Sequence, residues 1–500
     1  MDNIATESIS ILTDRQIDYN AGDIATIRLS GTECPLISGK NCFLRFNVIL
    51  DGNAKAQLEQ RAMGASVIER IEVWTGDEST NLETIRGYNE LAGLQYHYSQ
   101  TPGELAKRGL LEGWSNNGQF ESIYYAENDN TNVGQTLFRA VEICLPLRLS
   151  SILYQKVFPT VATNGLVVKV YFEKRNEKAL RVFTSYGFDT NNAFTLKTAL
   201  AANAQTTQVV LASTGAPAGQ LNANAENCPY VVGSIIQVQD NNGGPQGNVA
   251  ITAMAVNAAG DVELTTTAFT PTVACDANKK VIGLRELNNT SVFNATYKIQ
   301  NLEFIACVVK PGPAYFNSMM KKLKSDGGLV IDYYSFNQYV SNVAASEVHS
   351  EKLIPSMESR ACTVLNTMMN PAVSYTTDDL RPVIDTLSSY QFTIHQELVP
   401  QRAVLTERFN LGGLQFNAQC VHEQTKALSR CFNVRTECNN GQAFVVGREV
   451  SKPSYEANLR DTDLRLKLIY NNPQINKLLV SNIYHLRRLT VTDNGMIVDF

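Results

Sequence analysis

The sequence predicts an all-β protein that contains two β-sandwiches in tandem and a separate β-rich insertion in the first. Apolar and polar residues alternate with a period of two along most of the chain, the pattern of strands with one buried face. A similar order of elements occurs in each half. Residues 185–294 differ in composition: they include eleven charged residues in 110, about a tenth, whereas the whole chain is 18% charged.

The composition is sufficient for several buried cores, because hydrophobic residues make up 44% of the 500 positions. The net charge is -5 and no run of five like charges occurs, so sequence-specific nucleic-acid binding is not expected. The opening MDNIATESIS has neither the basic leader nor the apolar segment of a signal peptide, which predicts folding in a reducing cytosol. Apolar runs such as 304–309 are far shorter than the roughly 18 residues of a membrane-spanning helix.

Four strands show the alternation most clearly, and each is expected to cover one side of a core. The residues predicted on their buried faces are Leu44, Phe46, Val48 and Leu50; Val141, Ile143, Leu145 and Leu147; Leu166, Val168, Val170 and Phe172; and Leu464, Leu466, Leu468 and Tyr470. Turns rich in Gly, Pro and Asn separate such strands, which indicates a sandwich or barrel.

Helices are expected to be few and short. One is predicted from Ala314, where apolar residues recur at three- and four-residue spacing, and Gly327 and Gly328 provide its stop signal. This helix is predicted to connect the two halves. A second is predicted near Thr377, whose hydroxyl can cap it, and two acidic residues follow at the positive end of its dipole.

The internal repeat becomes visible when these pieces are set out in order. Residues 68–94 predict a strand, a tight turn, a second extended piece and a short helix, and residues 389–415 predict the same series. Each half then closes with two strong strands. These are 166–172 and 302–309 in the first half, and 464–470 and 483–491 in the second. Two similar sandwiches in tandem account for this order.

The insertion has strand and turn signals of its own, so it is predicted to be a small β domain. It interrupts two strands of one sandwich, and both of its ends must therefore return to the same rim, from which it would project as a tower. The predicted domains are 1–184 with 295–312 for the first sandwich, 185–294 for the insertion, and 313–500 for the second sandwich.

No constellation of residues predicts catalysis, and no catalytic or cofactor-binding residue is assigned. The fragment SGKN at Ser38 lacks the glycine spacing and hydroxyl residue of a phosphate-binding loop, and GASVI at Gly64 lacks the second glycine of a nucleophile elbow. The pair Asp461 and Asp463 is interpreted as charges at a loop end. Sequons cluster where the insertion ends and are interpreted as chance products; they begin at Asn288, Asn289 and Asn294.

No metal site is predicted either. The histidines are dispersed and none pairs with another at ligand spacing; they are His97, His349, His395, His422 and His485. His395 and Glu397 form the H-x-E of zinc deaminases, but the P-C-x-x-C that must follow is absent. Of the ten cysteines, only Cys431 and Cys438 lie close together, and buried free thiols are the expectation for the others.

Several passages resemble one known family. The segment IERIEVWTG with the GYNELAGL helix, the passage LFRAVEICLPLRLSSILYQKVFP and the strand GLVVKVYFEK resemble the first jelly roll of double jelly-roll major capsid proteins. These proteins build the shells of tailless double-stranded DNA viruses, including polinton-like viruses, virophages and the adenovirus hexon lineage. The pair SYQFTIHQELVPQ is similar to the corresponding passage of their second jelly roll.

The resemblance implies two eight-stranded jelly rolls per chain and a homotrimeric, pseudo-hexagonal capsomer that tiles an icosahedral virion shell. It implies a structural protein and no enzyme, made in the host cytosol without a signal peptide. Its partners would be its own copies, neighbouring capsomers, penton and minor capsid proteins; an internal membrane is left open. The Asn-rich loops near Trp114 and Asn128 are candidates for trimer contacts, or are ordinary solvated loops. The alternative hypothesis is a β-sandwich attachment or carbohydrate-binding protein whose insertion is the receptor module.

Overall fold

The computed structural model describes most of the 500 residues. The described ranges are 5–14, 18–52, 55–59, 61–99, 111–113, 140–154, 157–183, 185–188, 194–212, 235–257, 261–287, 295–325, 327–371, 387–406, 417–435, 444–451, 456–460, 462–471, 475–492 and 495–499. Within these ranges, no helix combines the length and the apolar character needed to cross a lipid bilayer.

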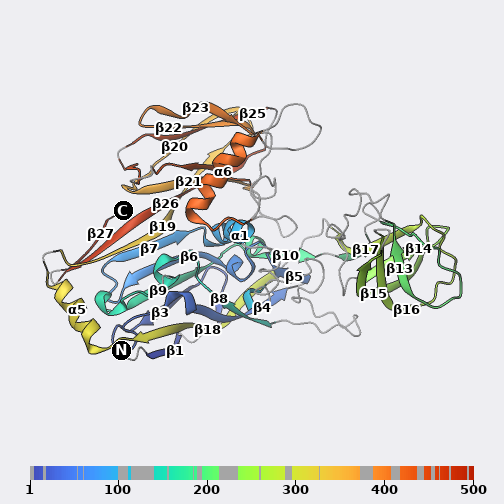
Figure 1. The fold of residues 1–500 in the computed structure, drawn as a ribbon, viewed down its shortest axis with the longest axis horizontal. Helices are drawn as coiled ribbons and strands as arrows, with labels where there is room; N and C mark the ends of the chain where they lie inside the picture. The colour runs from blue at the N-terminus through green and yellow to red at the C-terminus, as the bar shows by residue number, and fades with distance from the viewer. Residues whose placement is uncertain are drawn as a thin grey trace. The chain divides into compact units, whose positions relative to one another are not determined.

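The first sandwich consists of two antiparallel sheets (Figure 1). One sheet has the order β1 (Ala5–Leu12), β18 (Ala295–Lys310), β4 (Phe43–Gly52) and β8 (Ala140–Leu145), with β2 (Tyr19–Asn20) attached to β18. The other has the order β3 (Ile24–Leu29), β9 (Leu166–Phe172), β6 (Ile68–Thr75) and β7 (Asn81–Arg86). The chain crosses between the sheets so that its first and last strands pair, which is the order of a jelly roll.

The second sandwich repeats the order of the eight main strands, whereas among the described residues the small strands β2 and β27 (Gly495–Asp499) have no counterpart in the other roll. Its first sheet has the order β19 (Leu329–Val343), β26 (Lys477–Thr492), β21 (Ala361–Met369) and β24 (Val446–Glu449), with β27 (Gly495–Asp499) attached to β26. Its second sheet has the order β20 (His349–Ile354), β25 (Leu464–Tyr470), β22 (Leu387–Ile394) and β23 (Glu397–Leu405). Thus β19 and β26 correspond to β1 and β18, and β23 corresponds to β7.

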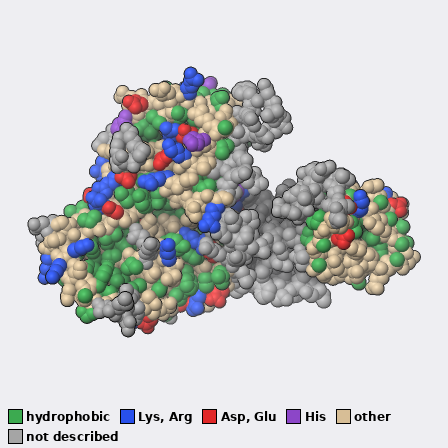
Figure 2. Space-filling view, viewed as in Figure 1, with side chains coloured by type: hydrophobic (Ala, Val, Ile, Leu, Met, Phe, Trp, Pro, Cys, Tyr) green, Lys and Arg blue, Asp and Glu red, His purple; other side chains and the backbone are tan. Residues whose placement is uncertain are grey.

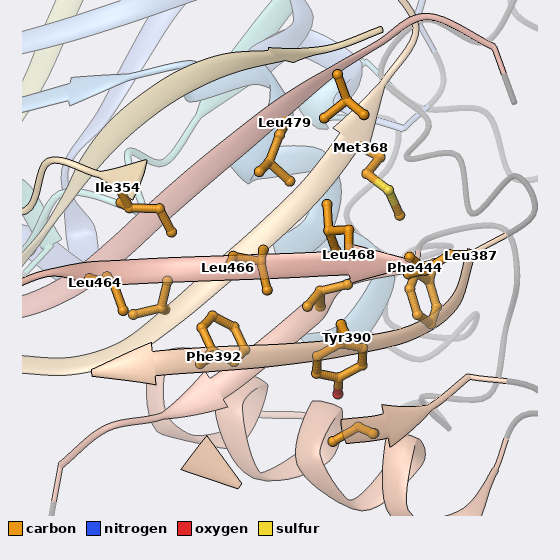
Figure 3. Packing of buried hydrophobic residues seen from close by; sticks show 14 of the residues in the cluster. Ile354, Met368, Leu387, Tyr390, Phe392, Phe444, Leu464, Leu466, Leu468 and Leu479 are labelled. Carbon is orange, nitrogen blue, oxygen red and sulfur yellow. The ribbon is translucent and has the colours of Figure 1, made fainter. Parts of the chain in front are cut away.

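The predicted buried faces form the cores. The predicted residues of β4, β9 and β25, together with Ile143, Leu145 and Leu147, are at most 2% exposed; the side chain of Val141 lies outside the described part. Figure 3 shows the second core, in which Leu466 and Leu468 of β25 and Phe392 of β22 lie with Met368 and Leu479 of the facing sheet. Period-two alternation identifies β4 and β25 because each has one face on a core and the other facing outward, whereas β21, which α6 (Ala418–Cys431) covers, is buried at all nine positions.

The helix of the first roll follows its hairpin as predicted, whereas the helix predicted within residues 389–415 would fall in residues 407–416, outside the described part, and the observed helix begins at Ala418. After the β6–β7 hairpin comes α1 (Tyr88–Ser99), and after the β22–β23 hairpin comes α6 (Ala418–Cys431), whose first turn is capped by the Asn417 side chain accepting from the Gln419 N–H. Helix α5 (Pro313–Leu323) joins β18 to β19, as predicted. The helix predicted near Thr377 falls outside the described residues. Short elements complete the first sandwich: β5 (Lys55–Leu58) paired with β10 (Leu180–Phe183), η1 (Gly39–Asn41), η2 (Met63–Val67), η3 (Thr160–Thr163), α3 (Ser151–Tyr154) and α4 (Asn176–Ala179).

The chain divides into two compact units, of which the first contains both sandwiches and the second takes in Val182–Phe293 between β9 and β18. The second unit has one sheet in the order β11–β17–β14–β15–β16–β13, with β12 also on β17. Its strands are β11 (Ser185–Phe188), β12 (Phe194–Thr195), β13 (Thr206–Leu211), β14 (Ile235–Gln239), β15 (Pro245–Val256), β16 (Val262–Phe269) and β17 (Lys280–Leu287).

This sheet closes on itself. Leu196, directly after β12, bridges to Leu211 of β13, and the Lys197 N–H donates to the Val210 carbonyl at 2.8 Å. The closed barrel encloses its own apolar core, which includes Leu196, Val209 and Ile236. The predicted fold class, all-β with two tandem jelly rolls and a β-rich insertion in the first, is confirmed.

Candidate assembly surfaces

The two jelly rolls meet along β7 and β19. Strand β7 is an edge of the first roll and lies against β19 of the second (Figure 1). The Tyr333 hydroxyl on β19 donates to the Leu82 carbonyl on β7, and Arg487 Nη1 on β26 donates to the same oxygen at 2.6 Å. Leu82 and Tyr333 are both buried, so the rolls share a packed junction instead of being joined by a linker alone.

An ionisable side chain lies inside this junction. Glu83 of β7 is fully buried and accepts a hydrogen bond from the Ser150 hydroxyl. Burial raises the pKa of Glu83 to about 7, although the hydrogen bond from the Ser150 hydroxyl and the positive charge of Arg487 favour the ionised form. Around neutral pH the carboxyl group is therefore divided between its protonated and ionised forms.

The rolls also approach closely beyond the end of β7. Gly87 has a φ of +57°, and a Cβ atom there would lie 2.1 Å from Gln338 Nε2 of β19. That amide donates to Glu90 Oε2 of α1 at 3.2 Å. Glycine is required at position 87 both for its left-handed backbone and for the space occupied by Gln338.

The strand that corresponds to β7 in the second roll is exposed. In the described chain β23 pairs only with β22, and Leu398 and Leu405 are 51% and 42% exposed. The hairpin turn before β23 contains His395 and Gln396 with φ of +52° and +67°, which is typical of a two-residue hairpin turn. An edge strand with exposed leucines is a candidate contact surface.

The strand that corresponds to β19 in the first roll is exposed as well. Strand β1 pairs with β18, and along it Thr6, Glu7, Ser8 and Ser10 are exposed. Leu12, at its end, is 52% exposed. Among the described residues, β1 pairs only with β18, so the first roll has an uncovered counterpart to the strand that the second roll uses in the junction.

The outer faces of the first roll carry paired charges. A groove of about 600 Å³ on the sheet that contains β1 and β4 is lined by Arg45, Glu142 and Glu303, among others. Arg45 contacts both carboxylates, and hydrogen bonding to Glu303 raises the pKa of Arg45. On the face shown in Figure 2, positive and negative side chains are interspersed. Such a surface favours specific protein contacts over the binding of a polyanion.

The five histidines lie apart in the fold. His349, His395 and His422 are exposed, on β20, in the β22–β23 turn and on α6 respectively. Burial lowers the pKa of His97 on α1 to about 4 and that of His485 on β26 to about 3. The described residues contain no cluster of three or more His, Cys, Asp or Glu that could hold a metal ion.

The remaining candidate residues are the aspartate pair, the cysteines, the Asn-rich loops and the sequons. Asp463 is exposed and pairs with Arg465 at 3.3 Å, and Asp461 lies outside the described residues. All eight described cysteines are free and six of them are buried, as the sequence predicts, while Cys144 and Cys431 are half-buried. Cys228 and Cys438 lie outside the described residues. The loops near Trp114 and Asn128 and the three sequons also fall outside the described part.

Sequence reasoning missed the junction residues. Glu83 lies in the segment NLETIR and Arg487 in HLRRLTV, and in both segments polar and charged residues are mixed with apolar ones. A charged residue at a buried register position is the signal that could have found Glu83, because Leu82 and Ile85 beside it are also fully buried. No pattern in the sequence predicts which strand of the second roll covers Glu83.

Comparison with known proteins establishes the fold. PBCV-1 VP54, as fitted into a reconstruction of the virophage Sputnik, shares 8% identity; the alignment covers 100% of this chain and 97% of that one, with a TM-score of 0.51. The Faustovirus major capsid protein shares 9% identity over 98% of this chain and 91% of that one, with a TM-score of 0.52. No protein-family model matches the sequence, and no curated protein matches it. The resemblance to double jelly-roll capsid proteins is thus confirmed at the level of the fold.

Proposed function

We propose that this chain is a major capsid protein whose trimer forms a pseudo-hexagonal capsomer of an icosahedral virion. One observation carries the proposal: the chain contains two jelly rolls of the same topology, packed directly on each other through β7 and β19. The likeness in fold to the Faustovirus major capsid protein supports the same role. The function is the enclosure of a genome, and the location is the virion.

The number of chains follows from the number of rolls. Two similar rolls per chain make each chain one third of a six-membered ring, so three copies form a tile with nearly hexagonal symmetry. Hexagonal tiles cover a surface without gaps. A trimer of tandem rolls therefore gives a lattice-forming unit from a single kind of chain.

The chemistry that this role needs is non-covalent. Rigid sheets position loops and edges, and burial of complementary surfaces supplies the free energy of assembly. We therefore propose a structural protein and no enzyme. Neighbouring capsomers would be its main partners, with penton and minor capsid proteins closing the shell.

The alternative hypothesis of an attachment or carbohydrate-binding protein finds no support in these likenesses. The solved structure with the higher of the two TM-scores is named as a major capsid protein. We therefore do not retain the alternative.

Native mass spectrometry combined with negative-stain electron microscopy tests the proposal. A trimer of a 55.1 kDa chain has a mass of about 165 kDa. We expect that species, and single particles with a hexagonal outline that form sheets or shells at high concentration. A protein that stays monomeric at micromolar concentration, or whose particles show a different symmetry, would contradict the proposed function.

A further inference from the structure

We propose that the folded chain forms a covalent amide crosslink between its own Lys178 and Asn89 side chains, with Glu173 transferring the protons. The reaction releases ammonia and needs no oxidant, cofactor or second protein. Each chain reacts once, so this is a self-modification. It goes beyond the capsid role and does not depend on it.

Three separate segments of the first roll bring the reacting side chains together. Lys178 lies in α4, Glu173 directly follows β9, and Asn89 is the second residue of α1. Ser66 of η2 contacts both helices: its carbonyl accepts from Asn89 Nδ2 at 3.4 Å, and its hydroxyl donates to the Ala179 carbonyl at 2.9 Å. The ends of α1 and α4 are therefore held against the same turn.

The Glu173 carboxylate contacts both reacting groups through one oxygen atom. Asn89 Nδ2 donates to Glu173 Oε2 at 3.0 Å, and Lys178 Nζ lies 3.6 Å from the same atom. A carboxylate in this position can take a proton from the amine and give a proton to the amide nitrogen, which is the leaving group. A lysine–glutamate ion pair that serves only stability needs no amide on the same oxygen.

Glu90 completes the arrangement in two ways. Its backbone N–H donates to Asn89 Oδ1 at 2.9 Å, which polarises the amide carbonyl and stabilises the negative charge that develops on this oxygen during attack. Its side chain fixes the amine, with Lys178 Nζ 2.6 Å from Glu90 Oε1. Nucleophile, proton carrier and oxyanion donor thus surround one amide group.

The site is shielded from water. Asn89 is fully buried, and Glu173 and Lys178 are only 3% and 6% exposed. Exclusion of water favours attack by the amine over hydrolysis of the amide. Burial alone would lower the pKa of Lys178, but Glu90 and Glu173 raise it above its ordinary value, so the resting group is an ammonium ion. The reaction therefore begins with the transfer of a proton from Nζ to a carboxylate.

The reaction exchanges one carbon–nitrogen bond for another. Glu173 takes a proton from the Lys178 ammonium group, and the amine attacks Asn89 Cγ, so that the Nζ–Cγ bond forms. Protonated Glu173 then delivers its proton to Nδ2 as the Cγ–Nδ2 bond breaks. Ammonia leaves with the second proton that Nζ loses, as an ammonium ion. No atom is oxidised or reduced, and Glu173 ends in its ionised form.

Mass spectrometry of the purified, denatured full-length chain tests the proposal. After allowance for processing of the terminus, the chain should be about 17 Da lighter than its sequence requires, and digestion should release a branched peptide that joins positions 89 and 178. A soluble, folded chain with the full sequence mass would overturn the proposal. So would a loss of ammonia that maps to a succinimide at an Asn-Gly sequence such as 164–165, because that product has the same mass.

Substitutions assign the roles. Lys178→Arg keeps a positive charge but removes the nucleophile, and Glu173→Gln removes the proton carrier, so both variants should have the full sequence mass. Lys352→Arg is the matched control, because Lys352 Nζ lies 2.7 Å from Glu347 Oε2 in an ion pair outside the site, and this variant should still lose ammonia. Circular dichroism and thermal melting will show which variants are folded. A branched peptide in folded Glu173→Gln at the unsubstituted level would contradict the role of Glu173.

The outcomes separate this proposal from the proposed function. A crosslink between positions 89 and 178 closes a long covalent loop, which restricts the unfolded chain and adds stability whether or not the chain assembles. A chain that forms trimers and has the full sequence mass would refute the crosslink and leave the capsid role intact. A crosslinked chain that stays monomeric would do the reverse.

Discussion

At the scale of single residues, Glu83 makes the stability of the roll–roll junction depend on pH. Its pKa is raised from the ordinary 4.5 to about 7 in the folded chain. Between pH 4.5 and 7 the folded state holds a proton that the unfolded state has released. The contribution of Glu83 to the free energy of unfolding is therefore fully present below about pH 4.5 and is lost as the pH rises through 7. The loss attributable to this residue is about 3 kcal/mol.

We predict that Glu83→Gln removes this dependence, because the amide stays neutral at every pH. Urea unfolding at pH 5 and pH 8 should show a smaller difference for the variant than for the unsubstituted chain, and the variant should be the more stable protein at pH 8. Equal losses of stability in both proteins would mean that the pH dependence arises elsewhere.

Gly87 gives a second prediction at this scale. Gly87→Ala should cost more than the roughly 1–2 kcal/mol of a left-handed alanine, because the new methyl group also displaces Gln338 from Glu90. Gly243→Ala is the matched control: its φ is +80° and no atom lies within 4 Å of the added Cβ. In a Gln338→Ala background the excess cost at position 87 should disappear in thermal or urea unfolding. If Gly87→Ala still costs more than Gly243→Ala in the Gln338→Ala background, the new methyl group must clash with an atom other than those of Gln338.

At the scale of elements, the hydrogen bonds of the junction hold β7 to β19. Tyr333→Phe removes one of the two described donors to the Leu82 carbonyl and leaves Arg487 in place, so we expect a loss of about 1 kcal/mol in the free energy of unfolding. Tyr315→Phe on α5, where the side chain is exposed, should change nothing measurable. If the two variants unfold alike, the hydroxyl of Tyr333 does not contribute to the junction.

The elements also show how far sequence reasoning reaches. The buried faces of β4, β9 and β25 were predictable because each strand has one side on a core and the other on solvent, which imposes a period of two. The connecting helix α5 was predictable from its apolar spacing and terminal glycines. The junction was not, because contacts between β7 and β19 join residues about 250 positions apart, such as Leu82 and Tyr333, and no local pattern encodes such a pairing.

At the scale of the whole molecule, the insertion predicted at residues 185–294 is proposed to be a separate folding domain. Its strands close into a barrel with an apolar core of its own, and it clusters apart from the two rolls. Strands β11 and β17 are antiparallel neighbours in which Ser185 lies opposite Leu287. The segments by which the chain enters and leaves the barrel therefore lie side by side, as the insertion of the barrel within one roll requires.

This geometry predicts that the barrel can be removed without unfolding the rolls. Residues 189–283 are replaced by a short Asn-Gly turn, which joins the ends of β11 and β17 as a hairpin across the spacing of two paired strands. Because the β7–β19 junction and both roll cores are untouched, the shortened chain should still form trimers in native mass spectrometry, and residues 182–293 expressed alone should unfold cooperatively. The control replaces only the β14–β15 connection, residues 240–244, by an equally short turn and keeps the barrel. It tests whether a loss of trimers comes from removing the barrel or from introducing a new turn. A shortened chain that is insoluble or molten, beside a barrel that folds alone, would mean that the rolls depend on the insertion, and the three-domain division would have to be abandoned.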